Sequence, residues 1–308
     1  MSSEAPVSSN YLECIANDST PDKSEGEKRD FHTSGLCGSW AMLGACENGH
    51  KFAKALDCGR EWCSVCRESS HKRRMARWFF KAQKINEMSM LSLDFSYGQG
   101  LRTKKELNQI GRVVREVLCS LGFDRGLRRW HWFGEGRPWF GSEINLFHPH
   151  LHILLESCFL DPGALDLVKE QIREALGIYD LVIHYQYTAE VRRIVFWLKY
   201  VTRPTFKKRD WDRDMAEELH NFRNSVSWGR WDDKDKWELP GEERIYNYIG
   251  KIERGFCPCC GAKIHWTKAI KIEGLDELDY QQIWVGVWLE RPPPRKVLDF
   301  KLLKIIGR

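Results

Sequence analysis

The sequence predicts an α+β protein built on an antiparallel sheet of the ferredoxin-like kind, with helices on one face and zinc-binding regions flanking it. Between residues 88 and 201, strand and helix periodicities alternate in the order β-α-β-β-α-β-α. Most of the 11 cysteines gather in two clusters, a pattern typical of metal sites. The 308 residues, of which 42% are hydrophobic, are enough to bury a sizeable core.

The predicted elements follow one another along residues 88–201. The first helix has Thr103 as its N-cap and Gly122 just past its end, and Pro162 occupies the favoured first position of the second helix. The strands are expected at 88–96, 129–134, 148–156 and 181–188, and the helices at 103–121, 162–176 and 190–201. This order leaves the face opposite the helices open for chemistry.

Composition excludes several classes of protein. A charged fraction of 30% and an aromatic fraction of 12% disfavour long disorder and collagen. There is no run of 18 apolar residues, and the first ten residues lack the pattern of a signal peptide. We therefore expect a cytoplasmic protein without a membrane partner, whose cysteines are reduced and available to metal.

Charge divides the chain unevenly. Residues 1–36 carry seven acidic and three basic side chains, a net charge of −4. Because the whole chain has a net charge of +5, the remaining residues carry a net charge of +9. We expect four parts: a disordered acidic tail (1–36), a zinc-binding region with a basic helix (37–86), a catalytic domain (87–205) and a C-terminal region with a second cysteine cluster (206–308). Residues 205–256 look irregular, and 282–289 look strand-like.

The first cysteine region contains seven possible ligands for Zn²⁺. It has too few apolar residues for a core of its own, so a metal is expected to hold it together, with one or two zinc sites. The candidate ligands are Cys37, Cys46, His50, Cys58, Cys63, Cys66 and His71. In the second cluster, Cys257 and Cys260 are the expected ligands, with His265 as a possible third and a distant residue to complete the site.

A basic run follows the first cysteine region. Residues 67–84 carry seven bases and one acid, a net +6, on a helix expected at about 69–86. A solvated helix face is one interpretation, and a polyanion such as DNA is the other. The candidate DNA-binding residues are Arg73, Arg74, Arg77 and Lys81, together with Arg203 and Lys207 further along.

Two histidines on the third strand suggest a second kind of metal site. Alternation places His150 and His152 on one face, about 6.6 Å apart along the strand. A divalent ion on two imidazoles also needs a carboxylate, for which Glu135 and Glu143 are the candidates. Such a ligand set suits Mn²⁺ or Mg²⁺ acting on a phosphate better than a closed zinc site.

Three motifs in order resemble those of the HUH endonucleases, whose catalytic core is an RRM-like sheet. They are Leu91-Ser-Leu-Asp-Phe95, the HPHLHILL run from His148 to Leu155, and Trp197-Leu-Lys-Tyr-Val-Thr-Arg-Pro204. The resemblance covers residues 88–205 and is closest to the rolling-circle replication initiators of plasmids and some viruses. The cysteine cluster is similar to the zinc-binding region of some replication proteins and related transposases.

This resemblance implies a DNA-nicking enzyme. Tyr200 would attack a phosphate of single-stranded or hairpin origin DNA, giving a 5′-phosphotyrosine link and a free 3′-hydroxyl that primes replication. Lys199 and Arg203 would supply positive charge beside it. Host helicase and polymerase would be the protein partners, and the oligomeric state is left open.

One position departs from the family pattern. Related initiators often carry a second Tyr or a Glu one turn before the nucleophile, where this chain has Phe196. Glu190, Tyr185, Tyr187 or a second subunit are the candidates for the missing function. The alternatives to an initiator are a single-tyrosine HUH transposase and a non-catalytic, zinc-containing nucleic-acid-binding protein.

Overall fold

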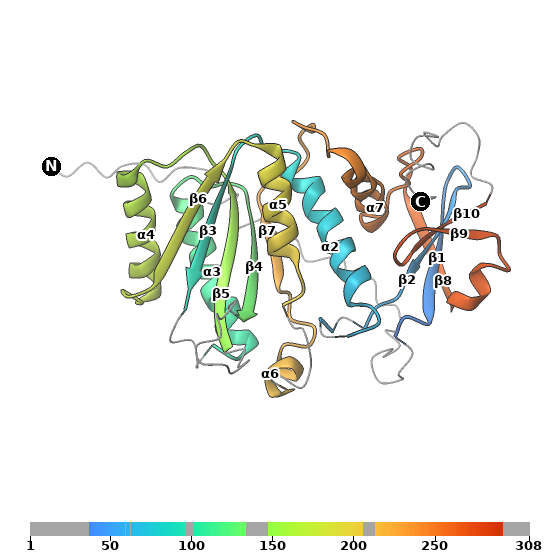
Figure 1. The fold of residues 1–308 in the computed structure, drawn as a ribbon, viewed down its shortest axis with the longest axis horizontal. Helices are drawn as coiled ribbons and strands as arrows, with labels where there is room; N and C mark the ends of the chain where they lie inside the picture. Colours follow the sequence, from blue (N-terminus) through green and yellow to red (C-terminus); the bar gives the residue numbers. More distant parts are fainter. Residues whose placement is uncertain are drawn as a thin grey trace. The chain divides into compact units, whose positions relative to one another are not determined.

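The computed structural model shows an α+β protein with two antiparallel sheets, each in its own compact unit (Figure 1). The residues described are 37–58, 60–61, 63–95, 101–133, 147–205 and 213–291. We call residues 84–201 and 205–236 the histidine unit, and residues 37–83, 202–204 and 237–291 the cysteine unit. None of the helices in the described ranges is both long and apolar enough to cross a membrane.

The sheet of the histidine unit has the strand order β6-β3-β5-β4-β7, with every neighbouring pair antiparallel. Its strands are β3 (Met88–Asp94), β4 (Gly126–Phe133), β5 (Phe147–Glu156), β6 (Val182–Thr188) and β7 (Ser225–Trp228). The first four match the predicted strands within a few residues. The fifth lies in the segment expected to be irregular, so that prediction was wrong there.

Three of the described helices of the histidine unit begin within a residue or two of where the sequence predicts, and a fourth lies in the segment expected to be irregular. They are α3 (Lys104–Ser120), α4 (Pro162–Leu176), α5 (Val191–Thr202) and the short α6 (Arg213–Glu218). Thr103 and Glu106 form a capping box at the start of α3, and the Asp161 side chain accepts from the amide of Ala164 at the start of α4. Gly177 ends α4 in the left-handed conformation, with φ of 66°.

The helices occupy both faces of this sheet. Gly111 of α3 lies against the side chain of Arg128 on β4, and α4 packs beside α3. His131 points to the opposite face of β4, where its ring bonds to the backbone of Val201 in α5. The expectation of one open face was therefore wrong, because α5 lies on the histidine side and borders a solvent-accessible cavity there.

The cysteine unit joins segments from distant parts of the chain. Its sheet has the order β8-β1-β2-β10-β9 and its helices α2 and α7 pack together. The elements are β1 (Trp40–Cys46), β2 (Lys51–Ala55), α2 (Arg67–Ala82), α7 (Ile245–Glu253), β8 (Ile264–Lys271), β9 (Tyr280–Trp284) and β10 (Val287–Glu290), with short 3₁₀ helices at Gly241–Arg244 and Ile272–Leu275. Gly250 lets the two helices approach, since a Cβ there would lie 2.9 Å from the carbonyl oxygen of Ala76.

An apolar core lies on one side of this sheet, so the first cysteine region has a source of stability besides the metal that the sequence predicts. The region contributes too few apolar residues by itself, and the rest come from beyond residue 270. The buried core residues are Ala41, Leu43, Ala53, Ala55, Leu275, Tyr280 and Trp288. The N-terminal hairpin is therefore completed by the C-terminal strands.

Candidate active site and zinc sites

Three histidines lie together on the sheet face that α5 covers. His150 and His152 alternate along β5, and antiparallel pairing places His131 of β4 opposite His150. One ring nitrogen from each histidine lies within 4.8 Å of those of the other two. The ring centroids are 4.5 to 5.3 Å apart. Three imidazole nitrogens this close could hold one metal ion.

Each of these imidazoles is oriented by a hydrogen bond on one ring nitrogen. Nε2–H of His131 donates to the Val201 carbonyl at 2.8 Å, and Nδ1–H of His150 donates to the His148 carbonyl at 2.9 Å. Nδ1 of His152 lies 2.8 Å from the hydroxyl of Ser92. Such bonds fix the tautomer and direct the second nitrogen of a metal-binding histidine toward the ion.

Burial favours the neutral form of the central histidine. His131 is 2% exposed, and this desolvation lowers its pKa well below the usual value for histidine. A neutral imidazole is the form that binds a metal ion. The ring of His131 is therefore held in the correct protonation state for coordination at neutral pH.

Tyr200 lies beside this histidine cluster. Its ring centroid is 5.3 Å from that of His152 and 5.7 Å from that of His131. The tyrosine and the two β5 histidines line a cavity of about 410 Å³, together with Met90, Ser92, Asp94, His148, His184, Gln186, Phe196 and Trp197. Nε2 of His148 lies 2.5 Å from the Asp94 carboxylate at the rim. A phenol and a possible metal site thus share one solvent-accessible space.

The other residues predicted for this site do not line the cavity or lie outside the described residues. Lys199 is exposed and does not line the cavity, although it is next to Tyr200 in the sequence. Arg203 is half-buried and belongs to the cysteine unit. Glu135, Glu143 and Lys207 lie outside the described residues.

His131 was missed by the sequence analysis. The run Arg129-Trp-His-Trp-Phe133 alternates in the same way as the HPHLH run, and the two strands were expected to be neighbours. Pairing them in antiparallel register would have placed a third histidine beside the first two.

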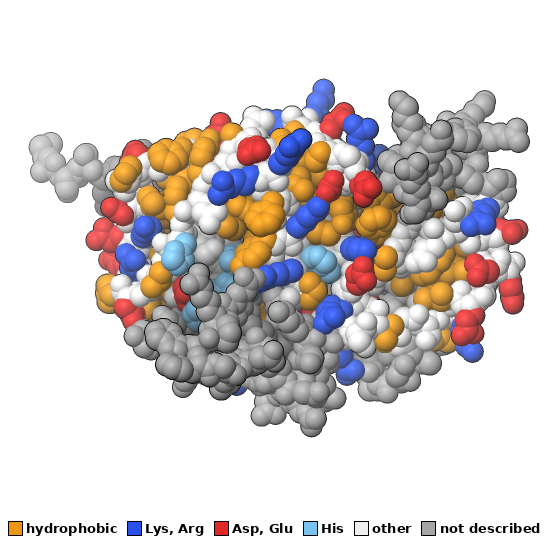
Figure 2. Space-filling model, in the orientation of Figure 1, with side chains coloured by type: hydrophobic (Ala, Val, Ile, Leu, Met, Phe, Trp, Pro, Cys, Tyr) orange, Lys and Arg blue, Asp and Glu red, His pale blue; other side chains and the backbone are white. Residues whose placement is uncertain are grey.

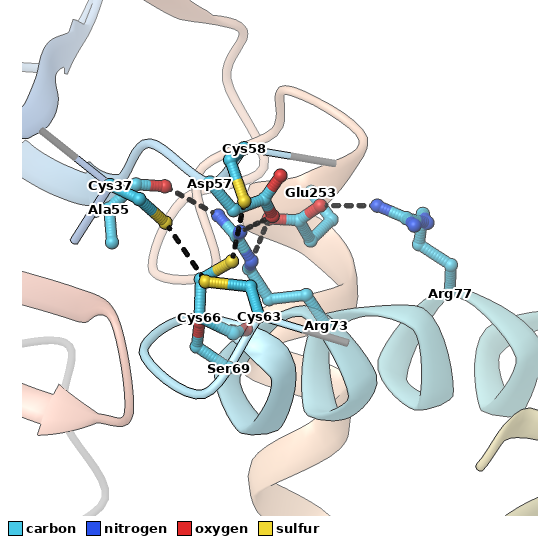
Figure 3. A network of polar contacts seen from close by, with 10 residues as sticks. All are labelled: Cys37, Ala55, Asp57, Cys58, Cys63, Cys66, Ser69, Arg73, Arg77 and Glu253. Atoms are coloured by element: carbon cyan, nitrogen blue, oxygen red, sulfur yellow. Dashed lines mark hydrogen bonds and ion pairs between the residues drawn. The ribbon is translucent and has the colours of Figure 1, made fainter. Parts of the chain in front are cut away.

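Four cysteines form the first candidate zinc site. Cys37, Cys58, Cys63 and Cys66 have sulfur atoms within 4.8 Å of one another, close to the start of α2 (Figure 3). The Sγ–Sγ distance is 3.5 Å between Cys37 and Cys63, and 3.6 Å between Cys58 and Cys66. The hydrogen bond from the Cys66 thiol lowers the pKa of Cys58 to about 5. This Cys₄ set could hold a structural zinc ion.

The second group joins the two ends of the cysteine unit. Cys46 and His50 flank the β1–β2 turn, and they meet Cys257 and Cys260 from the segment before β8. Nδ1 of His50 lies 3.3 Å from the sulfur of Cys46, 3.7 Å from that of Cys257 and 3.6 Å from that of Cys260. This Cys₃His set could also hold zinc, and it supplies the distant ligands that the sequence left unidentified.

Two histidines proposed as zinc ligands lie apart from these groups. Nδ1 of His71 is 2.9 Å from the carbonyl oxygen of Thr202, so the prediction that His71 binds zinc is corrected. Nε2 of His265 lies 3.8 Å from the Glu47 carboxylate on the surface. Both histidines are close to the cysteines in the sequence, but neither belongs to a cysteine cluster in the described structure.

The basic run on α2 is largely neutralised by acids from elsewhere in the chain. Arg73 is 6% exposed, pairs with Asp57 and donates to the carbonyl of Ala55, with Glu253 close by (Figure 3). The other pairs are Arg74 with Glu61, Arg77 with Glu253, Lys72 with Glu68 and, after the helix, Lys84 with Asp235. Basic and acidic side chains are interspersed on the face drawn in Figure 2.

This burial corrects the DNA-binding prediction for Arg73. A side chain enclosed by two carboxylates and a carbonyl oxygen stabilises the fold and has no surface for a phosphate. Lys81 is half-buried, and Arg77, with its side chain 48% exposed, already pairs with Glu253. The basic residues of α2 therefore offer much less free positive charge to a nucleic acid than the sequence suggested.

Arg73→Met is expected to lower the free energy of unfolding by about 3 kcal/mol, because it leaves the half-buried Asp57 carboxylate and the Ala55 carbonyl oxygen without this partner. Lys72→Met removes an ion pair with the exposed Glu68 and a contact with the ring of Trp284, and is expected to cost about 1 kcal/mol. Urea denaturation followed by circular dichroism measures both. If Arg73→Met instead kept full stability and only lost DNA affinity, a surface role would be indicated.

Comparison of the chain with protein-family models, curated proteins and solved structures finds no match.

Proposed function

We propose that this protein nicks single-stranded DNA by metal-assisted tyrosine transesterification and acts as a rolling-circle replication initiator. One observation carries the proposal: Tyr200 lines the same cavity as His150 and His152, two of the three members of the histidine cluster. The strand order β6-β3-β5-β4, with two helices on the opposite face, is also that expected of a ferredoxin-like or RRM-like HUH core. The resemblance of the three motifs supplies the substrate class.

His131, His150 and His152 would hold the catalytic ion. A set of three imidazoles favours Mn²⁺ over the harder Mg²⁺. When bound, the ion supplies Lewis-acid stabilisation of charge on the phosphate oxygens. The carboxylate first expected as a ligand is not needed to complete a three-ligand site with open positions.

Tyr200 would provide the nucleophile from α5. Its oxygen forms a bond to phosphorus, the bond from phosphorus to the 3′ oxygen breaks, and the phenol proton ends on that oxygen. The products are a 5′-phosphotyrosine link and a free 3′-hydroxyl. The number of phosphoester bonds is conserved, so the step needs no nucleotide cofactor.

The proposal is tested by incubating the zinc-loaded protein with pooled single-stranded oligonucleotides and Mn²⁺. We expect a protein–DNA adduct that survives denaturant and is absent when Mn²⁺ is omitted. Binding of DNA without any adduct would contradict the enzyme proposal and favour the non-catalytic DNA-binding alternative. Plasmid or viral origin sequences forming the adduct better than transposon ends would separate initiator from transposase.

His131→Leu is expected to weaken Mn²⁺ binding by more than about 100-fold, since it removes one of three ligands. His184→Leu serves as the control, because His184 lines the cavity but lies outside the cluster. Electron paramagnetic resonance of free Mn²⁺ measures the affinity in zinc-loaded protein. Equal Mn²⁺ affinity in His131→Leu and the unmodified protein would show that this imidazole is no ligand.

A further inference from the structure

The cavity beside Tyr200 continues beyond the histidines. Antiparallel pairing places Met90 of β3 opposite Gln186 of β6, two residues along the strands from Ser92 and its partner His184. Two residues of strand span about 6.6 Å. Both Met90 and Gln186 line the cavity. Its volume, about 410 Å³, is in the range of sites that enclose a small organic group.

Phe196 forms the helix side of this second part. It precedes Tyr200 by four residues on α5, so the two side chains project from the same side, about 6 Å apart along the helix axis. Phe196 lines the cavity while being 64% exposed, whereas its neighbour Trp197 is 2% exposed. An exposed phenyl ring at this position offers an apolar face toward the cavity.

The spacing on the helix matches the spacing on the sheet. One turn of α5 separates Tyr200 from Phe196, and two residues of strand separate the row of Ser92 from the row of Met90 and Gln186. A ligand whose reacting group lies at Tyr200 would therefore place its next group between the ring of Phe196 and this second row. The residues there are one aromatic, one apolar and one amide side chain.

We infer that Phe196, Met90 and Gln186 form a subsite for one nucleobase, adjacent to the phosphate that meets Tyr200. The inference rests on the proposed function for its substrate, single-stranded DNA. Every base can stack on an aromatic ring. The amide of Gln186 both donates and accepts, which matches the N6–H and N7 edge of adenine and not the two acceptors O6 and N7 of guanine, so adenine is the preferred base.

Equilibrium binding of fluorescent single-stranded DNA, followed by anisotropy, tests the subsite. The Tyr200→Phe background is used so that no bond is cut. Phe196→Ala is expected to raise the dissociation constant at least about fivefold, and Phe196→Trp is expected to keep it. The matched control is Phe159→Ala, which removes a ring that is 61% exposed and lies outside the cavity.

The base preference is measured with thymine oligonucleotides carrying one adenine at successive positions. We expect one position to tighten binding, and Gln186→Ala to abolish that gain. Unchanged binding in Phe196→Ala, or an equal loss in Phe159→Ala, would overturn the subsite. If the protein forms no covalent adduct with DNA but Phe196→Ala still selectively weakens binding, the nicking proposal fails while the subsite stands.

Discussion

Tyr200→Phe is expected to form no covalent adduct with single-stranded DNA, whatever the Mn²⁺ concentration. The substitution removes one oxygen and leaves the ring that packs 5.3 Å from His152 and 5.7 Å from His131. Histidine positions and metal affinity should therefore change little. Loss of a covalent nucleophile removes the reaction pathway itself, so the expected rate falls by several orders of magnitude. Denaturing gel electrophoresis of labelled DNA measures the adduct.

Tyr187→Phe is the matched control on the same unit. Tyr187 lies on β6 and its hydroxyl donates to the Glu87 carboxylate at 2.7 Å, which raises the pKa of this tyrosine to about 12. It does not line the cavity. We expect full adduct formation in this variant. Persistence of the adduct in Tyr200→Phe, or its loss in Tyr187→Phe alone, would assign the nucleophile elsewhere.

Four of the five strands in the sheet of the histidine unit could be predicted from the sequence, because each strand has a local periodicity. Thr103, Asp161 and Gly177 mark helix ends with their own side chains or conformation, and these boundaries were correct within a residue or two. The position of α5 could not be read in the same way. Which face a helix covers depends on packing with residues far along the chain, such as the bond from His131 to Val201.

The cysteine unit shows why its fold was not predictable from residues 37–86 alone. Met42 pairs with Lys54 on one side and Ala269 on the other, so β1 needs a partner more than 200 residues away. A segment with too few apolar residues to form a core by itself can still supply part of one, when the other apolar residues come from a distant part of the sequence. The same separation concealed the ligand pairing of Cys46 with Cys260.

The prediction of a DNA-binding surface on the basic run also failed to include distant residues. It counted charge only within residues 67–84 and left out the acidic side chains that pair with these bases in the fold. Arg73 meets Glu253 from α7, and Lys84 meets Asp235, each more than 150 residues later in the sequence. A net charge over 18 residues describes the unfolded segment. In the folded chain, the carboxylates nearest in space decide whether a base faces solvent or supports a helix.

Cys257→Ser is expected to lower the bound zinc, counted over the described clusters, from two ions to one and to unfold much of the cysteine unit. A structural zinc site contributes about 10 kcal/mol or more to folding in small domains. Here the Cys₃His group connects the β1–β2 turn to the segment before β8, so losing it frees the edge strand β8 from this turn. Zinc analysis by mass spectrometry and thermal denaturation measure the two effects.

Cys259→Ser distinguishes the zinc ligand from an ordinary thiol two residues away. Cys259 is half-buried, its pKa is raised mainly by burial, and it lies outside the Cys₃His group. We expect two zinc ions and a small change in melting temperature in this variant. The reverse result, with zinc lost only in Cys259→Ser, would mean that the ligand is misassigned. If neither variant lost zinc or stability, apolar contacts among residues such as Leu43 of β1 and Trp288 of β10 would suffice to hold the sheet together.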